Sequence, residues 1–359
     1  MVVGGGFFLK IAKVVTIILI LASSIYVIST ISNDSTKVSG VDYPAVSDNP
    51  KVTTEKIPYK QEIHNYEGLY SYIGMKSSEI KKLLGDPTRI DNSSYDYDWW
   101  IYNSDPQNYI QVGIENDKVV TVYGTGNSVN VTPFQIGQPI EELISKGLIK
   151  QTVSLTVDKN PYRFELSEED MVARPLLAMG DVYVQLYVDT FTKKISSIRF
   201  LDNVTLVKQR PYELVYRGEL LSAKEVKQDE WKEIEKGNTA QILDITNVLR
   251  IRHGLSPLKW DAKTAQVAYL HSKDMSTAGY FDHNSPTYGG LADRLAKGEV
   301  IYQVAGENIA AKYVDGIAAV EGWLNSEGHR ETLLNEEYNY LGVGVYEKFY
   351  TQNFILKWE

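Results

Sequence analysis

The chain has 359 residues, no cysteine, 43% hydrophobic and 23% charged residues, and a formal net charge of -9. This length exceeds what one ordinary hydrophobic core accommodates, so we expect two folded units. The acidic balance argues against a nucleic-acid partner, because phosphate binding requires a basic face. The lack of cysteine excludes disulfides, thiolate metal ligands and a cysteine nucleophile.

The N-terminal segment predicts a membrane anchor. Lys10 and Lys13 precede residues 14–31, an apolar run without a charged side chain. As a helix this run would extend about 27 Å, close to the hydrocarbon thickness of a bilayer. The lysines favour a cytoplasmic tip, so we predict a single-pass anchor in residues 1–31 with the remaining chain outside. The alternative is a signal peptide cleaved after small residues near Ala22, and both interpretations export the chain.

A linker and a duplicated region follow the anchor. Residues 32–61 are polar, contain prolines and lack periodicity, which is typical of a flexible linker. Residues 62–207 contain two similar stretches, each of which begins with Ile-Gly, continues with apolar residues at helical spacing and ends in alternating strands. We expect hairpin turns at residues 116–117 and 192–193. This pattern predicts a duplicated small α+β domain with a binding or spacing role.

Residues 93–103, SSYDYDWWIYN, are unusually rich in aromatic side chains. Aromatic rings with interspersed acids could stack on sugars or contact a partner. A strand with Tyr95, Tyr97 and Trp99 on one face explains the same pattern, because strands favour aromatic residues. We favour the strand.

The next segments predict a connector followed by helices. Residues 208–236 are increasingly charged and helix-favouring, which predicts a semi-rigid connector. Residues 239–253 place apolar side chains on one face of a helix. Asp261 and Asp315 are suitable N-caps for two further helices, the second of which we expect to extend to Gly328.

The domain of residues 237–359 ends in two alternating segments that predict a hairpin. Gly342 and Gly344 in the first segment indicate close packing against a neighbouring element. Helices followed by strands predict a sheet between helical layers. Three polar stretches, which we expect to form loops, lie between these elements: FDHNSP around His283, AGENIA around Glu307 and SEGHRETLLN around His329.

These segments, in this order, resemble the CAP superfamily of cysteine-rich secretory proteins, antigen 5 and plant pathogenesis-related proteins, and in particular its cysteine-free bacterial branch. The resemblance covers about residues 239–356 and rests on HGLSPLKWD, FDHNSP, ADRL, GENIA, WLNSEGHRETLLN, LGVGV and YTQNF. The duplicated region resembles a domain that often precedes bacterial members. The resemblance implies an α+β chain with a C-terminal α-β-α sandwich and a central cleft, preceded by the duplicated domain and a transmembrane helix.

The same resemblance implies a functional site. In better-known members, two histidines and two glutamates line the cleft. Here His283 matches the first histidine and Glu307 the first glutamate, whereas Ser326 and Phe349 stand at the other two positions. The bacterial pattern supplies His329, from GHR, as a replacement imidazole entering the same cleft.

Three interpretations of this His-Glu-His set are open. Two imidazoles and a carboxylate could hold zinc or another divalent cation with one open position, which makes His283, Glu307 and His329 tentative metal ligands. Glu307 with a histidine could instead act as a general acid-base pair, so the same residues are candidates for catalysis. In the structural interpretation, they hydrogen-bond one another, lock three loops together and are buried with all partners satisfied.

Other polar residues are interpreted as structural. His271 is expected to make a hydrogen bond on a helix face, and His253 to complement a helix C-terminus. Ser285 lies outside a G-x-S-x-G elbow, so no nucleophile is predicted there. Arg294 and Asn308 are expected to tie loops together through side-chain hydrogen bonds.

Our preferred hypothesis is a membrane-anchored protein of a bacterial envelope that binds a lipid, glycan or peptide in the His/Glu cleft. The alternative is a hydrolase, metal-dependent or acid-base, that acts on envelope or peptide substrates, so enzymatic activity stays open. A third hypothesis is an envelope scaffold in which the duplicated domain matters most and the cleft is vestigial. None of the three involves nucleic acid.

Overall fold

The computed structural model describes residues 68–358. The predicted anchor in residues 1–31 and the linker in residues 32–61 lie outside the described residues. Within the described part, no helix has both the length and the apolar character that a membrane crossing requires.

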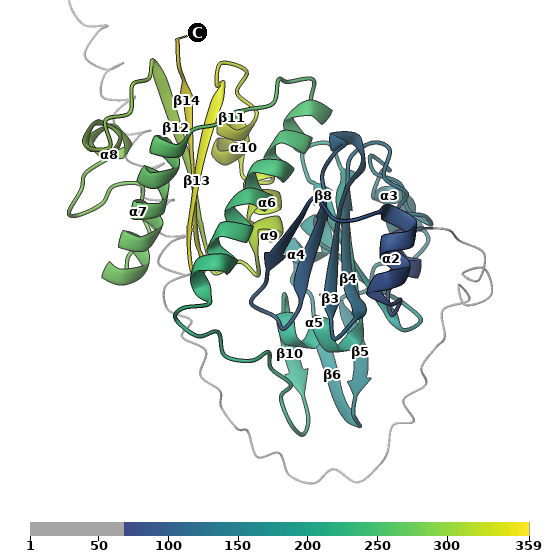
Figure 1. The fold of residues 1–359 in the computed structure, drawn as a ribbon. Coiled ribbons are helices and arrows are strands. Elements are labelled where there is room, and N and C mark those ends of the chain that lie inside the picture. The colour runs from purple at the N-terminus through teal and green to yellow at the C-terminus, as the bar shows by residue number, and fades with distance from the viewer. Residues whose placement is uncertain (1–67, 359) are drawn as a thin grey trace, which may run out of the picture. The chain divides into compact units, whose positions relative to one another are not determined.

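The N-terminal domain is built on a seven-stranded sheet in the order β1-β2-β3-β4-β9-β8-β7 (Figure 1). All neighbouring strands in this sheet are antiparallel. The first half of the domain supplies β1 to β4, the second half supplies β7 to β9, and the two halves meet where β4 pairs with β9. The strands are β1 (Arg89–Asn92), β2 (Asp98–Tyr102), β3 (Tyr109–Glu115), β4 (Lys118–Thr125), β7 (Leu176–Met179), β8 (Val182–Asp189) and β9 (Lys194–Leu201).

Equivalent backbone contacts in the two halves match the repeated sequence. The amide of Gly74 donates a hydrogen bond to the carbonyl of Val119, and the amide of Gly137 donates one to Ile195, both at 2.8 Å. Gly74 and Gly137 have φ angles of 85° and 84°, in the region that favours glycine. Each half therefore attaches its Ile-Gly segment to its own hairpin in the same way.

A second sheet of the N-terminal domain has the order β10-β6-β5. It consists of β5 (Thr152–Val157), β6 (Asn160–Glu165) and β10 (Glu213–Tyr216). Because β10 pairs with β6, the first part of the predicted connector, residues 208–236, belongs to the N-terminal domain instead. The short helices of this domain are η3 (Leu69–Tyr72), α2 (Ser77–Leu84), η4 (Pro106–Asn108), α3 (Glu141–Ser145), α4 (Glu168–Ala173) and α5 (Asn203–Gln209).

The C-terminal domain confirms the predicted α-β-α sandwich (Figure 1). Its sheet has the order β11-β13-β14-β12, in which only the pairing of β11 with β13 is parallel. The strands are β11 (Lys259–Trp260), β12 (Val304–Ala311), β13 (Tyr340–Tyr346) and β14 (Phe349–Leu356). The helices are α6 (Trp231–Arg252), α7 (Ala262–Ala278), α8 (Leu291–Lys297), α9 (Gly316–Leu324) and α10 (Glu327–Leu333).

Successive residues of β13 face the two helical layers in turn. Leu341, Val343 and Val345 belong to the hydrophobic cluster that contains the buried faces of α6 and α9. Gly342 and Gly344 point to the opposite face, where a Cβ atom would collide with the backbone of α7. The close packing expected from these glycines is therefore present.

The helix caps agree with the sequence, but two helix limits differ from the expected ones. The carboxylates of Asp261 and Asp315 each accept a hydrogen bond from the amide three residues later, at 2.8 and 3.1 Å. The helix that Asp315 caps ends at Leu324, and Gly328 lies inside the separate helix α10, so the expected continuous helix is wrong. Helix α6 begins at Trp231, within the predicted connector.

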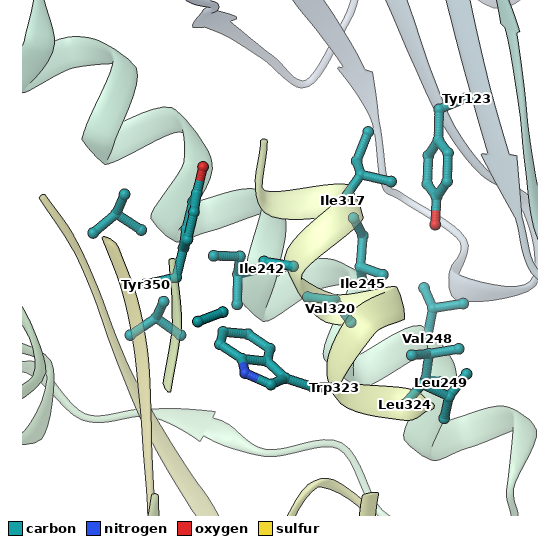
Figure 2. Close-up of a cluster of buried hydrophobic side chains, with 14 of the residues drawn as sticks. Tyr123, Ile242, Ile245, Val248, Leu249, Ile317, Val320, Trp323, Leu324 and Tyr350 are labelled. Atoms are coloured by element: carbon teal, nitrogen blue, oxygen red, sulfur yellow. The ribbon is translucent and has the colours of Figure 1, made fainter. Parts of the chain in front are cut away.

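The two domains share one hydrophobic cluster. Tyr97 and Trp99 of the N-terminal domain belong to the same buried cluster as Ile242 of α6 and Trp323 of α9. Figure 2 shows Tyr123 of the N-terminal sheet together with the side chains of α6 and α9 in this cluster. Tyr95 and Tyr97 lie before the strand, since β2 begins at Asp98, but their rings are buried with Trp99 as the one-face interpretation requires. The partner of this aromatic stretch is the C-terminal domain of the same chain.

Candidate functional site

Glu307 is the centre of the candidate site. It lies on β12 and not in a loop, because AGENIA pairs with β14 along its whole length. Its side chain is only 3% exposed, and its carboxylate oxygens accept hydrogen bonds from Nη1 and Nη2 of Arg294 at 2.8 and 3.0 Å. Burial alone would raise the pKa of the Glu307 carboxyl, but the hydrogen bonds from His283 and Arg294 lower it. Glu307 is therefore a buried carboxylate at neutral pH.

His283 lies in the loop between α7 and α8 and is oriented by Glu307. Its Nδ1 lies 2.9 Å from Oε1 of Glu307, and a carboxylate can only accept, so we assign the proton to Nδ1. Nε2 of a neutral ring then carries the free lone pair. The His283 side chain is 51% exposed, and its backbone carbonyl accepts a hydrogen bond from Arg294 at 2.8 Å. Arg294 thus holds both the carboxylate and the loop that presents the imidazole.

Ser285 fixes the shape of this loop. Its hydroxyl donates to Asp274 at 2.7 Å and accepts from the amides of Thr287 and Tyr288 at 3.1 and 2.8 Å. Asp274 also accepts from the hydroxyl of Tyr280. All of these bonds hold the loop, in agreement with the structural role expected for Ser285.

His329 lies opposite His283 and comes from α10, not from the loop that we expected. The centroids of the two imidazole rings are 6.4 Å apart. Burial, together with the nearby His283, lowers the pKa of His329, so its ring is neutral at neutral pH. The side chain of Asn308 donates to the His329 carbonyl at 3.0 Å and connects the start of α10 to β12. The structure therefore brings His283 next to both Glu307 and His329.

His271 is a neighbour of the site that the sequence interpretation missed. Its ring on α7 is fully buried, and Nε2 lies 3.9 Å from Oε1 of Glu307. Burial lowers the pKa of His271, so His271 is a neutral imidazole next to the Glu307 carboxylate. A signal was present in the sequence: Val267 and Met275, four residues away on either side, are apolar, which places His271 on the buried face of its helix.

The site does not fit a divalent cation. The carboxylate of Glu307 already accepts three hydrogen bonds, two from Arg294 and one from Nδ1 of His283. This leaves only the two imidazoles as ligands, fewer than a zinc site uses. The guanidinium beside the carboxylate would also repel a cation. Among residues 68–358, no group of three or more His, Asp or Glu side chains is arranged to hold a metal ion. The tentative assignment of His283, Glu307 and His329 as zinc ligands is therefore not supported.

Family models match both domains. A model described as CAP-associated N-terminal matches residues 73–212, and a model described as cysteine-rich secretory protein family matches residues 243–357. The chain belongs to this family, the CAP family, as the sequence motifs indicated.

Three relatives that match most of this chain are named as a membrane, an extracellular and a secretory protein. The uncharacterized membrane protein YlbC of Bacillus subtilis is 53% identical over 310 residues, which cover 86% of this chain and 90% of YlbC. A Bacillus anthracis extracellular protein with an SCP domain shares 44% identity, with a TM-score of 0.78 over 88% of this chain and 99% of that one. A cysteine-rich secretory protein from Staphylococcus aureus shares 29% identity, with a TM-score of 0.71 over 81% of this chain and 93% of that one.

Proposed function

We propose that this CAP protein is anchored in the membrane of a bacterial envelope and binds a lipid, glycan or peptide at the paired histidines His283 and His329. The observation that carries the proposal is the hydrogen bond from the exposed His283 to the buried Glu307. The anchor rests on the apolar run in residues 14–31 and on the name of the relative YlbC.

The distribution of exposure favours a binding role over a purely structural one. A set that only locks the fold together would bury all of its members. Here the supporting groups Glu307 and Arg294 are 3% and 5% exposed, whereas the His283 side chain is 51% exposed. The buried pair therefore presents an oriented imidazole to the surroundings, beside the neutral His329. Two imidazoles can donate and accept hydrogen bonds, which suits hydroxyl, amide or phosphate groups.

A second candidate function is hydrolysis by acid-base chemistry. The Nδ1 proton of His283 is held by a carboxylate, which leaves Nε2 able to take a proton from a water molecule as its oxygen attacks a carbonyl carbon. The same nitrogen would then return the proton to the leaving group. This candidate depends on the charge of Glu307 much more strongly than binding does.

Binding can be tested with the full-length protein held in lipid nanodiscs without free detergent. Anionic lipid vesicles, peptidoglycan fragments and envelope peptides are the probes, with His283→Ala, His329→Ala and Glu307→Gln as variants. We expect both alanine variants to lose binding of one probe at least tenfold. Lys236→Ala is the control, because Lys236 is 79% exposed on α6. Equal binding by wild type and both histidine variants would contradict the proposal.

The two candidate functions respond differently to Glu307→Gln. The substitution should weaken ligand binding only modestly, since a glutamine oxygen can still accept from His283. Acid-base hydrolysis should instead fall on the order of a hundredfold or more. Turnover of a bound probe that this variant abolishes would replace the binding proposal with the hydrolase.

A further inference from the structure

We propose that the N-terminal domain is a positioning component of the paired-histidine site, acting through α10, the helix that carries His329. The contact is made by residues 188–191, which comprise the last two residues of β8 and the start of the turn to β9; we refer to this segment as the turn. The inference takes from the proposed function only the assignment of His329 to the site.

Arg330, the residue after His329, is bound to this turn. Its Nη1 and Nη2 donate to Oδ1 and Oδ2 of Asp189, both at 3.0 Å, which is a bidentate pair. The two side chains are only 14% and 7% exposed, and the guanidinium lies 4.7 Å from the ring centroid of Phe191. Burial alone would raise the pKa of the Asp189 carboxyl, but His253 and Arg330 hold it well below its usual range. The pair is therefore charged and holds α10 in one geometry.

Asn325 makes a second connection just before α10. Its side-chain oxygen accepts from the amide and the hydroxyl of Thr190 at 2.9 and 3.1 Å, and its side-chain nitrogen donates to the carbonyl of Val188 at 2.8 Å. These three bonds involve both the donor and the acceptor of the amide. The segment between α9 and α10 is thereby attached to the turn independently of Arg330.

Another side of the same helix meets the site. Neighbouring residues on an α-helix point about 100° apart, so Arg330 can face the N-terminal domain while His329 faces His283. The His329 backbone is also held by Asn308, which follows Glu307 on β12. Helix α10 therefore lies between the turn and the strand that carries Glu307, and a shift of the turn changes the environment of His329.

The test is a proton titration of the histidines by NMR on the full-length chain, in which five histidines give few signals. Asp189→Asn keeps an acceptor for the turn amides and removes the charge that binds Arg330. Asn325→Ala removes the second connection without changing charge. We expect both variants to raise the pKa of His329 by roughly 0.3 unit or more, because a looser helix exposes the ring.

The direction of the His329 pKa shift distinguishes a displaced α10 from the mere loss of the Asp189 charge. Loss of the Asp189 charge would by itself lower an imidazole pKa, so a rise reports a displaced ring, either less buried or farther from His283. The matched control is Asp244→Asn, which breaks another ion pair between the domains, Arg89 with Asp244 at 2.9 Å. An unchanged or lowered His329 pKa in both test variants, or the same rise in the control, would overturn the inference. Since no ligand is needed, the outcome is independent of whether the proposed function holds.

Discussion

The guanidinium of Arg199 on β9 forms two hydrogen bonds with the carboxylate of Asp315, the residue that caps α9, at 2.9 and 2.8 Å. The two side chains are 1% and 8% exposed, so this pair joins the domains through a buried contact. Removing one partner leaves an uncompensated buried charge, which typically costs about 3–5 kcal/mol. We therefore expect Arg199→Met to lower the free energy of unfolding by about that amount in urea titrations.

The control for this prediction is the exposed pair of Lys81 and Asp86, whose side chains are 49% and 83% exposed. Lys81→Met should change the free energy of unfolding by less than about 1 kcal/mol, because solvent screens such pairs. Equal effects of the two substitutions would show that the buried pair does not hold the domains together.

Close packing between β13 and α7 leads to a second prediction. Gly344→Ala places a methyl group into the backbone of α7, and overpacking of this kind costs about 1–3 kcal/mol or more. Gly328→Ala in α10 is a matched control, since a Cβ there meets no atom within 4 Å. We expect the control to be neutral or to stabilise by roughly 0.5–1 kcal/mol, as alanine does inside a helix. Thermal unfolding of both variants measures the difference.

Local rules predicted most of the C-terminal domain. Asp261 and Asp315 cap their helices, because a cap depends on neighbours in the sequence. Gly342 and Gly344 indicated a close approach at alternate positions of a strand, although the sequence did not identify α7 as the helix packed there. The helix limit at Gly328 was wrong because α9 ends at Leu324, where the side chain of Asn325 bonds to Val188 of the N-terminal domain, and a separate helix begins at Glu327.

Long-range contacts could not be predicted in the same way. Arg330 and Asp189 are 141 residues apart, and no local pattern pairs an arginine on a helix with an aspartate at the end of a distant strand. The aromatic residues near Trp99 were correctly assigned to one face. Their spacing does not show, however, that the C-terminal domain packs on that face. The contact between His283 and Glu307 was predicted from the family resemblance. Their separation of 24 residues does not by itself indicate that the two side chains are close in space.

Glu307 should make stability depend on pH. Burial opposes its charge, but His283 and Arg294 lower its folded pKa below the ordinary 4.5. A carboxyl with a depressed folded pKa stabilises the fold above its unfolded pKa, and this contribution is lost as the pH falls through the folded pKa. We expect Glu307→Gln to lower the free energy of unfolding at pH 7 and the difference from wild type to narrow below about pH 4.5. A difference that stays constant from pH 7 to pH 3 would contradict this assignment.

His329 should titrate below an ordinary histidine. Burial is the main cause and the nearby His283 the second, so NMR should give a pKa below 6.5 that rises in His283→Ala. A histidine with a lowered folded pKa favours the fold while it is neutral, and this contribution is lost as the pH falls from about 6.5 through the folded pKa. The fold should therefore lose stability over that range, and His329→Gln should remove this part of the loss. A His329 pKa at or above 6.5 would contradict the burial of this ring beside His283.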